Sequence, residues 1–301
     1  MRDLVIEALT ELVPVRVSRQ ELMRGSRRLR WAEAGVGWPT IVLVAGCGEV
    51  ALDWASIMPK LAECSRVIAY DRAGLGESEP AVSLTLETQI EDLAALLDEV
   101  GPAVVVGHSW GGLLAQLVAF SHPHRIAGLV LIDPSHEDLE TWWATAAEVA
   151  MATGVVSLKS VGLFGKAARG MGRSLAARCT DDDRLRGLIA DAYVASYASR
   201  QQVRMIRTEA LLAARSAPVA REARGRSVLP DVPVVILSAA RGKPRSLQER
   251  SASLMREIAA STPRGRHSVV DDAGHYIHHD RPEVVIEAIV DLVAVIRTES
   301  E

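Results

Sequence analysis

The segment that most restricts the fold is a short apolar run that enters a tight turn and leaves it as a helix. Residues 103–112 read Ala-Val-Val-Val-Gly-His-Ser-Trp-Gly-Gly, and an apolar stretch with helical spacing follows directly. Gly107 and Gly111 flank Ser109 in a G-x-S-x-G pattern, where larger side chains would collide with neighbouring backbone. A chance match is the alternative, but the run before it, the helix after it and Gly112 argue against chance. The segment predicts a nucleophile elbow with Ser109 at its tip.

Short apolar runs rich in Val, Ile and Leu recur along the rest of the chain. Such runs are typical of strands buried on both faces, as in a parallel sheet covered by helices. Segments with helical spacing lie between them, at 86–100, 110–121 and 281–297. The alternation predicts an α/β fold with a mostly parallel, doubly wound sheet. The expected strands are Ile41–Ala45, Val67–Tyr70, Ala103–Val106, Gly128–Ile132, Val232–Ser238 and His267–Val270.

One long interval breaks this alternation. Residues 135–229 contain no strand pattern, only Ala- and Arg-rich helical pattern interrupted by glycines. An interval of this length is too long for a loop. We therefore expect a helical cap at 135–229, inserted between a first core part at 1–134 and a second at 230–301. Its aromatic residues either line a pocket or pack the cap: Trp142, Trp143, Tyr193 and Tyr197.

The order of the motifs resembles that of the α/β-hydrolase superfamily, over nearly the whole chain outside the cap. The segments in question are VLVAG, YDRAGLGES, GHSWGG, LVLIDP and GHYIHHDRPE. The resemblance implies an α/β-hydrolase fold and a catalytic triad whose serine, acid and histidine come in that chain order. It also implies a mostly structural role for Asp71 and Arg72, in the loop that follows the strand at Val67–Tyr70.

A serine hydroxyl needs a neighbouring base to become nucleophilic, and His275 is the best candidate. It follows an apolar strand, precedes a helix and lies near the C-terminus. His278 and His279 are close in sequence, so a metal site formed with His275 is the alternative. The matching loop of the superfamily often has this histidine spacing without a metal. We therefore expect neither a metal nor a cofactor.

The acid of the triad is expected at Asp133. Most members of the superfamily have it after the strand that here ends near Ala239, but residues 240–248 contain no Asp or Glu. A minority have it at the end of the preceding core strand, which here ends in Asp133-Pro134. A structural role for Asp133 is the alternative, and Glu137 and Asp138 are the other candidate acids.

Acyl transfer also needs two backbone N–H groups that stabilise a negative oxygen. One is expected from Trp110, which follows the nucleophile, and the other from Cys47 in the loop after the strand at Ile41–Ala45. The superfamily often has His-Gly in that loop, whereas this chain has Ala45-Gly46-Cys47-Gly48. A role for Cys47 as a second nucleophile is the competing hypothesis, although no base is placed for it.

The composition limits which binding partners and which cellular compartment are expected. A net charge of −4 over 301 residues gives no argument for nucleic acid or an acidic membrane, and the cluster at Arg24–Arg30 indicates a solvated hairpin. Three scattered cysteines suggest reduced thiols and a cytoplasmic protein. The acidic residues among the first apolar ones indicate an amphipathic helix, not a signal peptide, and no stretch is long enough to span a membrane. The expected partner is a small-molecule substrate, and the sequence carries no signal of the oligomeric state.

These features predict an enzyme that hydrolyses a small ester, a lactone or a related carbonyl compound through an acyl-serine. A serine excludes the aspartate-nucleophile route of dehalogenases and of most epoxide hydrolases. One alternative is a biosynthetic enzyme on the same elbow that cyclises, cleaves a C–C bond or transfers an acyl group. Another is a non-catalytic ligand-binding receptor, and the pair Ser109 and His275 argues against it.

Overall fold

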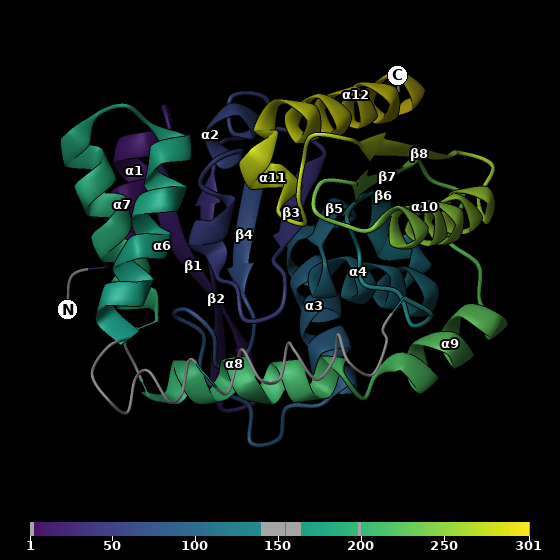
Figure 1. Ribbon diagram of the computed structural model, residues 1–301, viewed down its shortest axis with the longest axis horizontal. Helices are drawn as coiled ribbons and strands as arrows, with labels where there is room; N and C mark the ends of the chain where they lie inside the picture. Colours follow the sequence, from purple (N-terminus) through teal and green to yellow (C-terminus); the bar gives the residue numbers. More distant parts are fainter. Residues whose placement is uncertain (1–2, 140–153, 155–163, 198–199, 301) are drawn as a thin grey trace.

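The computed structural model describes residues 3–139, 154, 164–197 and 200–300, and its centre is one eight-stranded sheet (Figure 1). The strand order is β1-β2-β4-β3-β5-β6-β7-β8. Strand β2 pairs antiparallel with both β1 and β4, and all other neighbours are parallel. The strands are β1 (Val17–Arg24), β2 (Arg27–Ala34), β3 (Thr40–Val44), β4 (Val67–Asp71), β5 (Ala103–His108), β6 (Ile126–Ile132), β7 (Val234–Ala239) and β8 (Gly265–Val270).

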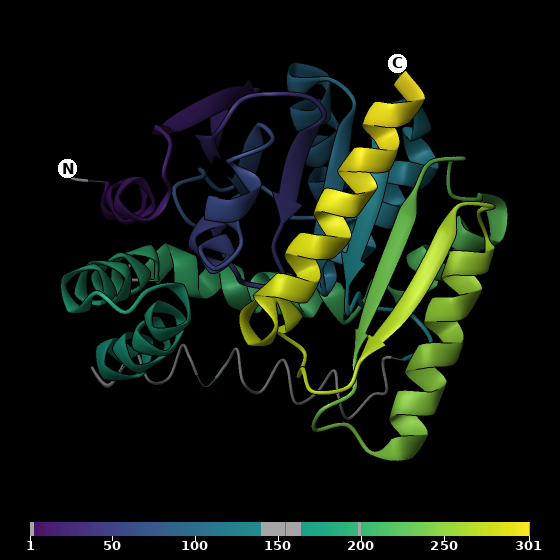
Figure 2. The same cartoon turned by 90° about the horizontal axis from the view of Figure 1, so that it is seen from above.

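Helices cover both faces of the sheet. Alternate residues of β3 point to opposite faces: Ile41 and Leu43 join a core with α1 and α12, whereas Val42 and Val44 join a core with α3, α4 and α10. Figure 2 shows α12 and α10 on opposite sides of β7 and β8. The helices outside the interval between β6 and β7 are α1 (Leu4–Leu12), α2 (Met58–Leu61), α3 (Leu86–Val100), α4 (Trp110–Ser121), α10 (Arg245–Ala260), α11 (Ile277–Asp280) and α12 (Pro282–Ser300), with short 3₁₀ helices η1 (Ala51–Trp54) and η2 (Pro123–Arg125).

The expected fold class is confirmed. Some predicted strand bounds differ from the observed ones by one or two residues. Strand β6 begins at Ile126, two residues before the expected Gly128, because Ile126 already pairs with Ala103. Strand β7 begins at Val234 instead of Val232, after Pro233, which has no N–H to donate to a neighbouring strand. Helices α3 and α4 have the expected bounds.

The expected hairpin near the N-terminus is formed by β1 and β2. Its arginines are paired with carboxylates: Arg24 and Arg27 contact the buried Asp92, and Arg28 contacts Glu79. Arg30 contacts Glu21, so each arginine of the cluster has a carboxylate partner, although Arg24 and Arg27 share one.

The regular elements that the structure describes between β6 and β7 are all helices: α6 (Phe164–Cys179), α7 (Asp183–Ser196), α8 (Arg200–Ala213) and α9 (Ala217–Arg226). Helix α7 lies beside α1 and α6 packs on α7, whereas α8 runs along the edge of the sheet where β3 and β4 end (Figure 1). Tyr193 and Tyr197 are buried, which favours packing over pocket lining. Trp142 and Trp143 lie outside the described residues. The division into core and cap stays a prediction.

None of the described helices is long and apolar enough to cross a membrane.

Candidate active site

The site is built on a sharp turn between β5 and α4. Ser109 has a φ of 50°, a left-handed value that is strained for a residue with a side chain. The turn brings α4 against β3 so closely that a Cβ atom at Gly111 would lie 2.1 Å from the carbonyl oxygen of Val44. Only glycine fits there. The N–H groups of Gly112 and Leu113 donate to the carbonyl oxygen of Ser109, so α4 begins directly after the serine.

The ends of neighbouring strands are joined by main-chain hydrogen bonds. The N–H of Ser109 donates to the carbonyl of Ile132 over 3.0 Å, and the N–H of Asp133 donates to the carbonyl of Leu237 over 2.7 Å. Asp133 has a φ of 39°, and together with Ser109 it makes up the positive-φ positions other than glycine in the described chain. The backbone therefore turns sharply at both strand ends, β5 and β6, in the same layer of the molecule.

Ser109, His275 and Asp133 form a continuous hydrogen-bonded chain. His275 Nε2 lies 2.9 Å from Ser109 Oγ, and His275 Nδ1 lies 2.7 Å from Asp133 Oδ2. Asp133 is buried, whereas the side chain of His275 is 45% exposed and open to an incoming molecule. The contact that the sequence predicts between Asp133 and His275 is present. Its catalytic role stays a prediction.

Asp133 is also held by Lys243, a residue that sequence reasoning missed. Lys243 Nζ lies 2.8 Å from each carboxylate oxygen, and the N–H of Ala239 donates to Oδ1 over 3.0 Å. Burial alone would raise the pKa of Asp133, but the hydrogen bond and charge of His275 and the charge of Lys243 lower it to about 2. The acid is therefore ionised and fixed in orientation. Lys243 follows β7, in the loop where most of the superfamily has the acid itself.

The two other candidate acids are engaged elsewhere. Glu137 is buried and pairs with Arg224 of α9 over 2.7 Å. Asp138 pairs with Arg221 of the same helix over 2.7 Å. Both carboxylates therefore connect the end of β6 to α9.

A second ion pair lies next to His275. His108 Nε2 is 3.0 Å from the carbonyl oxygen of His275, and because a carbonyl can only accept, Nε2 donates. His108 Nδ1 is 3.1 Å from Glu49 Oε2. Burial would raise the pKa of Glu49, but the charge and hydrogen bond of His108 lower it to about 2, and the same carboxylate raises the pKa of His108 against its own burial. We therefore assign His108 as an imidazolium that fixes the backbone of His275.

The alternative hypothesis is a metal bound by His275, His278 and His279. The positions of the possible ligand atoms do not support it. Among the described residues, two groups have ligand atoms within 4.8 Å of one another, and neither contains His275 or His279: one is Glu49, His108 and His278, and the other is His136, Glu137 and Asp138, whose carboxylates are paired with α9. His278 is fully buried, and neither of its ring nitrogens has a hydrogen-bond partner among the described residues. Both ring nitrogens of His108 are engaged, however, so His108 has no lone pair for a metal in this arrangement. These residues do not fit a metal site.

The loop after β3 is held from both sides of Cys47. The N–H of Gly46 donates to Glu49 over 2.5 Å, and the N–H of Gly48 donates to Glu209 of α8 over 2.6 Å. These bonds fix the peptide planes next to Cys47. Cys47 itself packs at the edge of an apolar cluster that contains Trp110. The roles of Cys47 and Trp110 in an oxyanion hole stay predictions.

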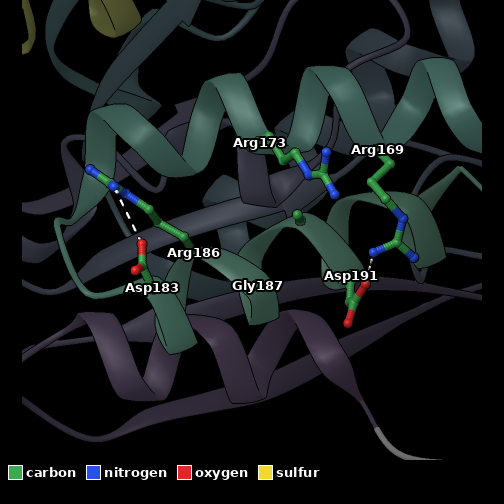
Figure 3. A pocket seen from close by; sticks show the side chains of 7 residues that line it. Arg169, Arg173, Asp183, Arg186, Gly187 and Asp191 are labelled. Atoms are coloured by element: carbon green, nitrogen blue, oxygen red, sulfur yellow. Dashed lines mark hydrogen bonds and ion pairs between the residues drawn. The ribbon is translucent and has the colours of Figure 1, made fainter.

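A hollow of about 380 Å³ is lined by residues of α6 and α7, and Ser109 is not among them. Figure 3 shows it between α6 and α7, with Arg169 directed to Asp191 and Arg186 directed to Asp183. Because none of the lining residues is Ser109, His275 or Asp133, the hollow is separate from the candidate active site.

With the geometry in view, comparison with known proteins identifies the family. The alpha/beta hydrolase family matches residues 41–288, and the chain belongs to it.

Two relatives illustrate the similarity. A soluble epoxide hydrolase of Corynebacterium sp. (strain C12) is 32% identical over 123 residues, which make up 39% of this chain and 42% of the relative. A 2-hydroxymuconate semialdehyde hydrolase of Pseudomonas sp. (strain CF600) is 33% identical over 137 residues, or 41% of this chain and 48% of the relative. The chain thus aligns with less than half the length of these relatives.

A solved structure extends the similarity of fold to most of the chain. Cfl2 from Burkholderia cenocepacia superposes with a TM-score of 0.73 at 20% identity, and the match covers 92% of this chain and 96% of Cfl2. At this identity the match shows the fold alone.

Replacing Asp133 tests its assignment as the acid. Asp133→Asn keeps the shape of the side chain but presents an amide that stabilises the wrong tautomer of His275, so kcat should fall by up to about 10⁴-fold. KM should change little, because Asp133 does not contact substrate. The control is Glu249→Gln, which changes an exposed carboxylate paired with Arg245 and should leave kcat unchanged. Less than a tenfold loss with Asp133→Asn would remove Asp133 from the triad.

A buried carboxyl beside Glu49 predicts a pH-dependent stability. Burial and the Glu49 charge raise the pKa of Asp53 from 3.8 to about 7. Between these values the unfolded chain releases a proton that the folded chain keeps, so stability falls as the pH rises from about 4 to 7 and is then constant. From pH 5 to 7 the Asp53 contribution to the unfolding free energy should fall by about 2–3 kcal/mol.

Urea unfolding at pH 5 and pH 7.5 measures this effect. Asp53→Asn should gain stability relative to the wild type on going to the higher pH. Asp271→Asn, at an exposed position, should show the same difference from the wild type at both pH values. An Asp53→Asn difference that does not change with pH would refute the neutral state of Asp53.

Proposed function

We propose that the chain is a serine hydrolase that cleaves a small ester, a lactone or a related carbonyl compound through an acyl-serine intermediate. The observation that carries this proposal is the hydrogen-bonded chain from Ser109 Oγ through His275 to the ionised Asp133, at the tip of a strained elbow. Membership of the alpha/beta hydrolase family supports it. The small, scattered set of three cysteines supports a cytoplasmic location.

In the first half-reaction, Ser109 Oγ attacks the carbonyl carbon of the substrate while His275 Nε2 takes the hydroxyl proton. The C=O bond becomes a C–O⁻ bond, and the tetrahedral intermediate is stabilised by the N–H groups of Trp110 and Cys47. Asp133 stabilises the imidazolium that forms. The intermediate then expels the alcohol oxygen, which takes the proton from His275, and an acyl-serine remains.

In the second half-reaction, water replaces the alcohol. His275 removes a proton from the water as its oxygen attacks the acyl carbon, and the second tetrahedral intermediate collapses to release the carboxylic acid. The proton on His275 returns to Ser109 Oγ. The exposed side of His275 leaves room for the water and for exchange of alcohol and acid.

Several relatives carry the name epoxide hydrolase, so epoxide opening is the obvious competing activity. The position at the elbow tip argues against it here, because it holds a serine and the aspartate-nucleophile route needs a carboxylate there. The carboxylate of Asp133 cannot replace it, since it is buried behind His275 and bonded to Lys243. The serine favours carbonyl chemistry.

A short-chain chromogenic ester and a fluorophosphonate probe test the proposal together. The wild type should release the chromophore and should be labelled at Ser109, as read by mass spectrometry of the peptide that spans 103–125. Ser109→Ala should lose labelling and retain less than about a hundredth of the wild-type kcat, because loss of the covalent step costs several orders of magnitude.

The other outcomes separate the alternatives. Labelling at Ser109 without ester turnover would favour a biosynthetic enzyme on the same elbow. Neither labelling nor turnover would contradict the hydrolase and favour a ligand-binding receptor. Labelling at Cys47 would transfer the nucleophile role from Ser109 to that thiol.

A further inference from the structure

A carboxylate from the cap helix α8 is buried inside the catalytic core. Glu209 is 1% exposed, although it lies on a helix whose other face meets solvent. It accepts four hydrogen bonds: one from Gly48 N–H, two from the Arg72 guanidinium and one from the Gln89 amide, at 2.6–2.8 Å. The triad does not use this residue, and nothing in its own stretch of sequence distinguishes it from a surface glutamate.

The first arm of this network ends on the loop that contains Cys47. Glu209 holds Gly48 N–H directly, and Arg72, fixed by Glu209, donates to the carbonyl oxygens of Ala45 and Gly46, both over 2.5 Å. Gly48 has a φ of 73°, and a Cβ atom there would lie 2.9 Å from the side chain of Ile206. Helix α8 therefore contacts the loop directly, and the Glu209 carboxylate fixes the backbone on both sides of Cys47.

The second arm ends on the residue that follows the nucleophile. Gln89 Nε2 donates to Glu209 over 2.6 Å, and the Oε1 atom of the same amide accepts from Trp110 Nε1 over 2.8 Å. All three side chains are buried, so these bonds are not exchanged for water. The end of α8 also packs in the same apolar cluster as Trp110, through Ala213 and Leu212.

From these contacts we infer that Glu209 is a positioning residue for the oxyanion hole, and that helix α8 completes the hole by fixing the N–H groups of Cys47 and Trp110 relative to each other. The inference rests on the proposed function, because it assigns those N–H groups to a developing oxyanion. It makes the cap part of the catalytic apparatus. A role limited to neutralising the buried Arg72 charge is the competing explanation.

Two substrates that differ in one atom separate these explanations. In an ester the oxyanion hole receives oxygen, and in the matching thionoester it receives sulfur, a much weaker hydrogen-bond acceptor. A well-formed hole therefore favours the ester strongly. A variant with a loosened hole loses that preference, whereas a variant that is only less stable turns over both substrates less and keeps their ratio.

The variants are Glu209→Gln, which removes the charge, and Glu209→Asp, which keeps the charge but withdraws it by one methylene group. In both, kcat/KM for the ester should fall by about 10²-fold, the size of effect seen when one oxyanion donor is lost. The ratio of ester to thionoester kcat/KM should fall at least tenfold. Glu222→Gln, an exposed carboxylate on α9, is the matched control and should leave the ratio unchanged. An unchanged ratio in folded Glu209→Asp would overturn the inference.

Amide hydrogen exchange tests the same point without turnover. In the variants the peptide that contains Gly46–Glu49 should exchange at least tenfold faster, while the peptide from β5 stays as protected as in the wild type. If the wild type neither turns over esters nor reacts with a fluorophosphonate, the proposed function and the oxyanion assignment fail together, and the exchange result decides only whether Glu209 positions the loop around Cys47. Equal protection of the loop in wild type and variants would then refute it.

Discussion

The close approach of α4 to β3 at the elbow is the constraint on which the rest of the site depends. Because Gly111 lies almost against the backbone of Val44, the chain must reverse within a single residue after β5, and Ser109 takes the strained φ that this reversal requires. The buried strands and the helix on either side stabilise this strained backbone conformation. The sharp turn fixes the Ser109 hydroxyl at the carboxyl edge of the sheet, where the loops after the neighbouring strands converge.

The same edge explains how a carboxylate at the end of β6 meets His275. Asp133 turns with a positive φ at the end of β6, and its N–H is bonded to the end of β7, so its carboxylate reaches His275. Lys243, from the loop after β7, holds both carboxylate oxygens. On the far side, the His108 imidazolium and Glu49 hold the backbone of His275. The histidine is thus positioned by two separate ion pairs.

The sequence alone predicted those parts of the site that depend on local patterns. The elbow, the strand-end acid and the histidine each follow an apolar run, and the absence of carboxylates at 240–248 directed attention to Asp133. Lys243, Glu49 and Glu209 escaped prediction because their roles come from contacts across long separations, such as Glu209 with Gly48. A lone charged residue on a helix gives no sign that it is buried. The starts of β6, β7 and β8 were each missed by two residues: pairing with the neighbouring strand already begins at Ile126 and Gly265, and Pro233 delays the start of β7.

In the proposed mechanism, Ser109 and His275 act as one catalytic unit. A double-mutant cycle of Ser109→Ala and His275→Ala, with kcat measured on the same ester, tests it most directly. If the two residues perform one proton-coupled attack, either substitution alone should abolish the covalent step, and the double variant should be no more than a few-fold slower than either single one. Losses that multiply, so that the double variant is slower by the product of the two single effects, would contradict the claim.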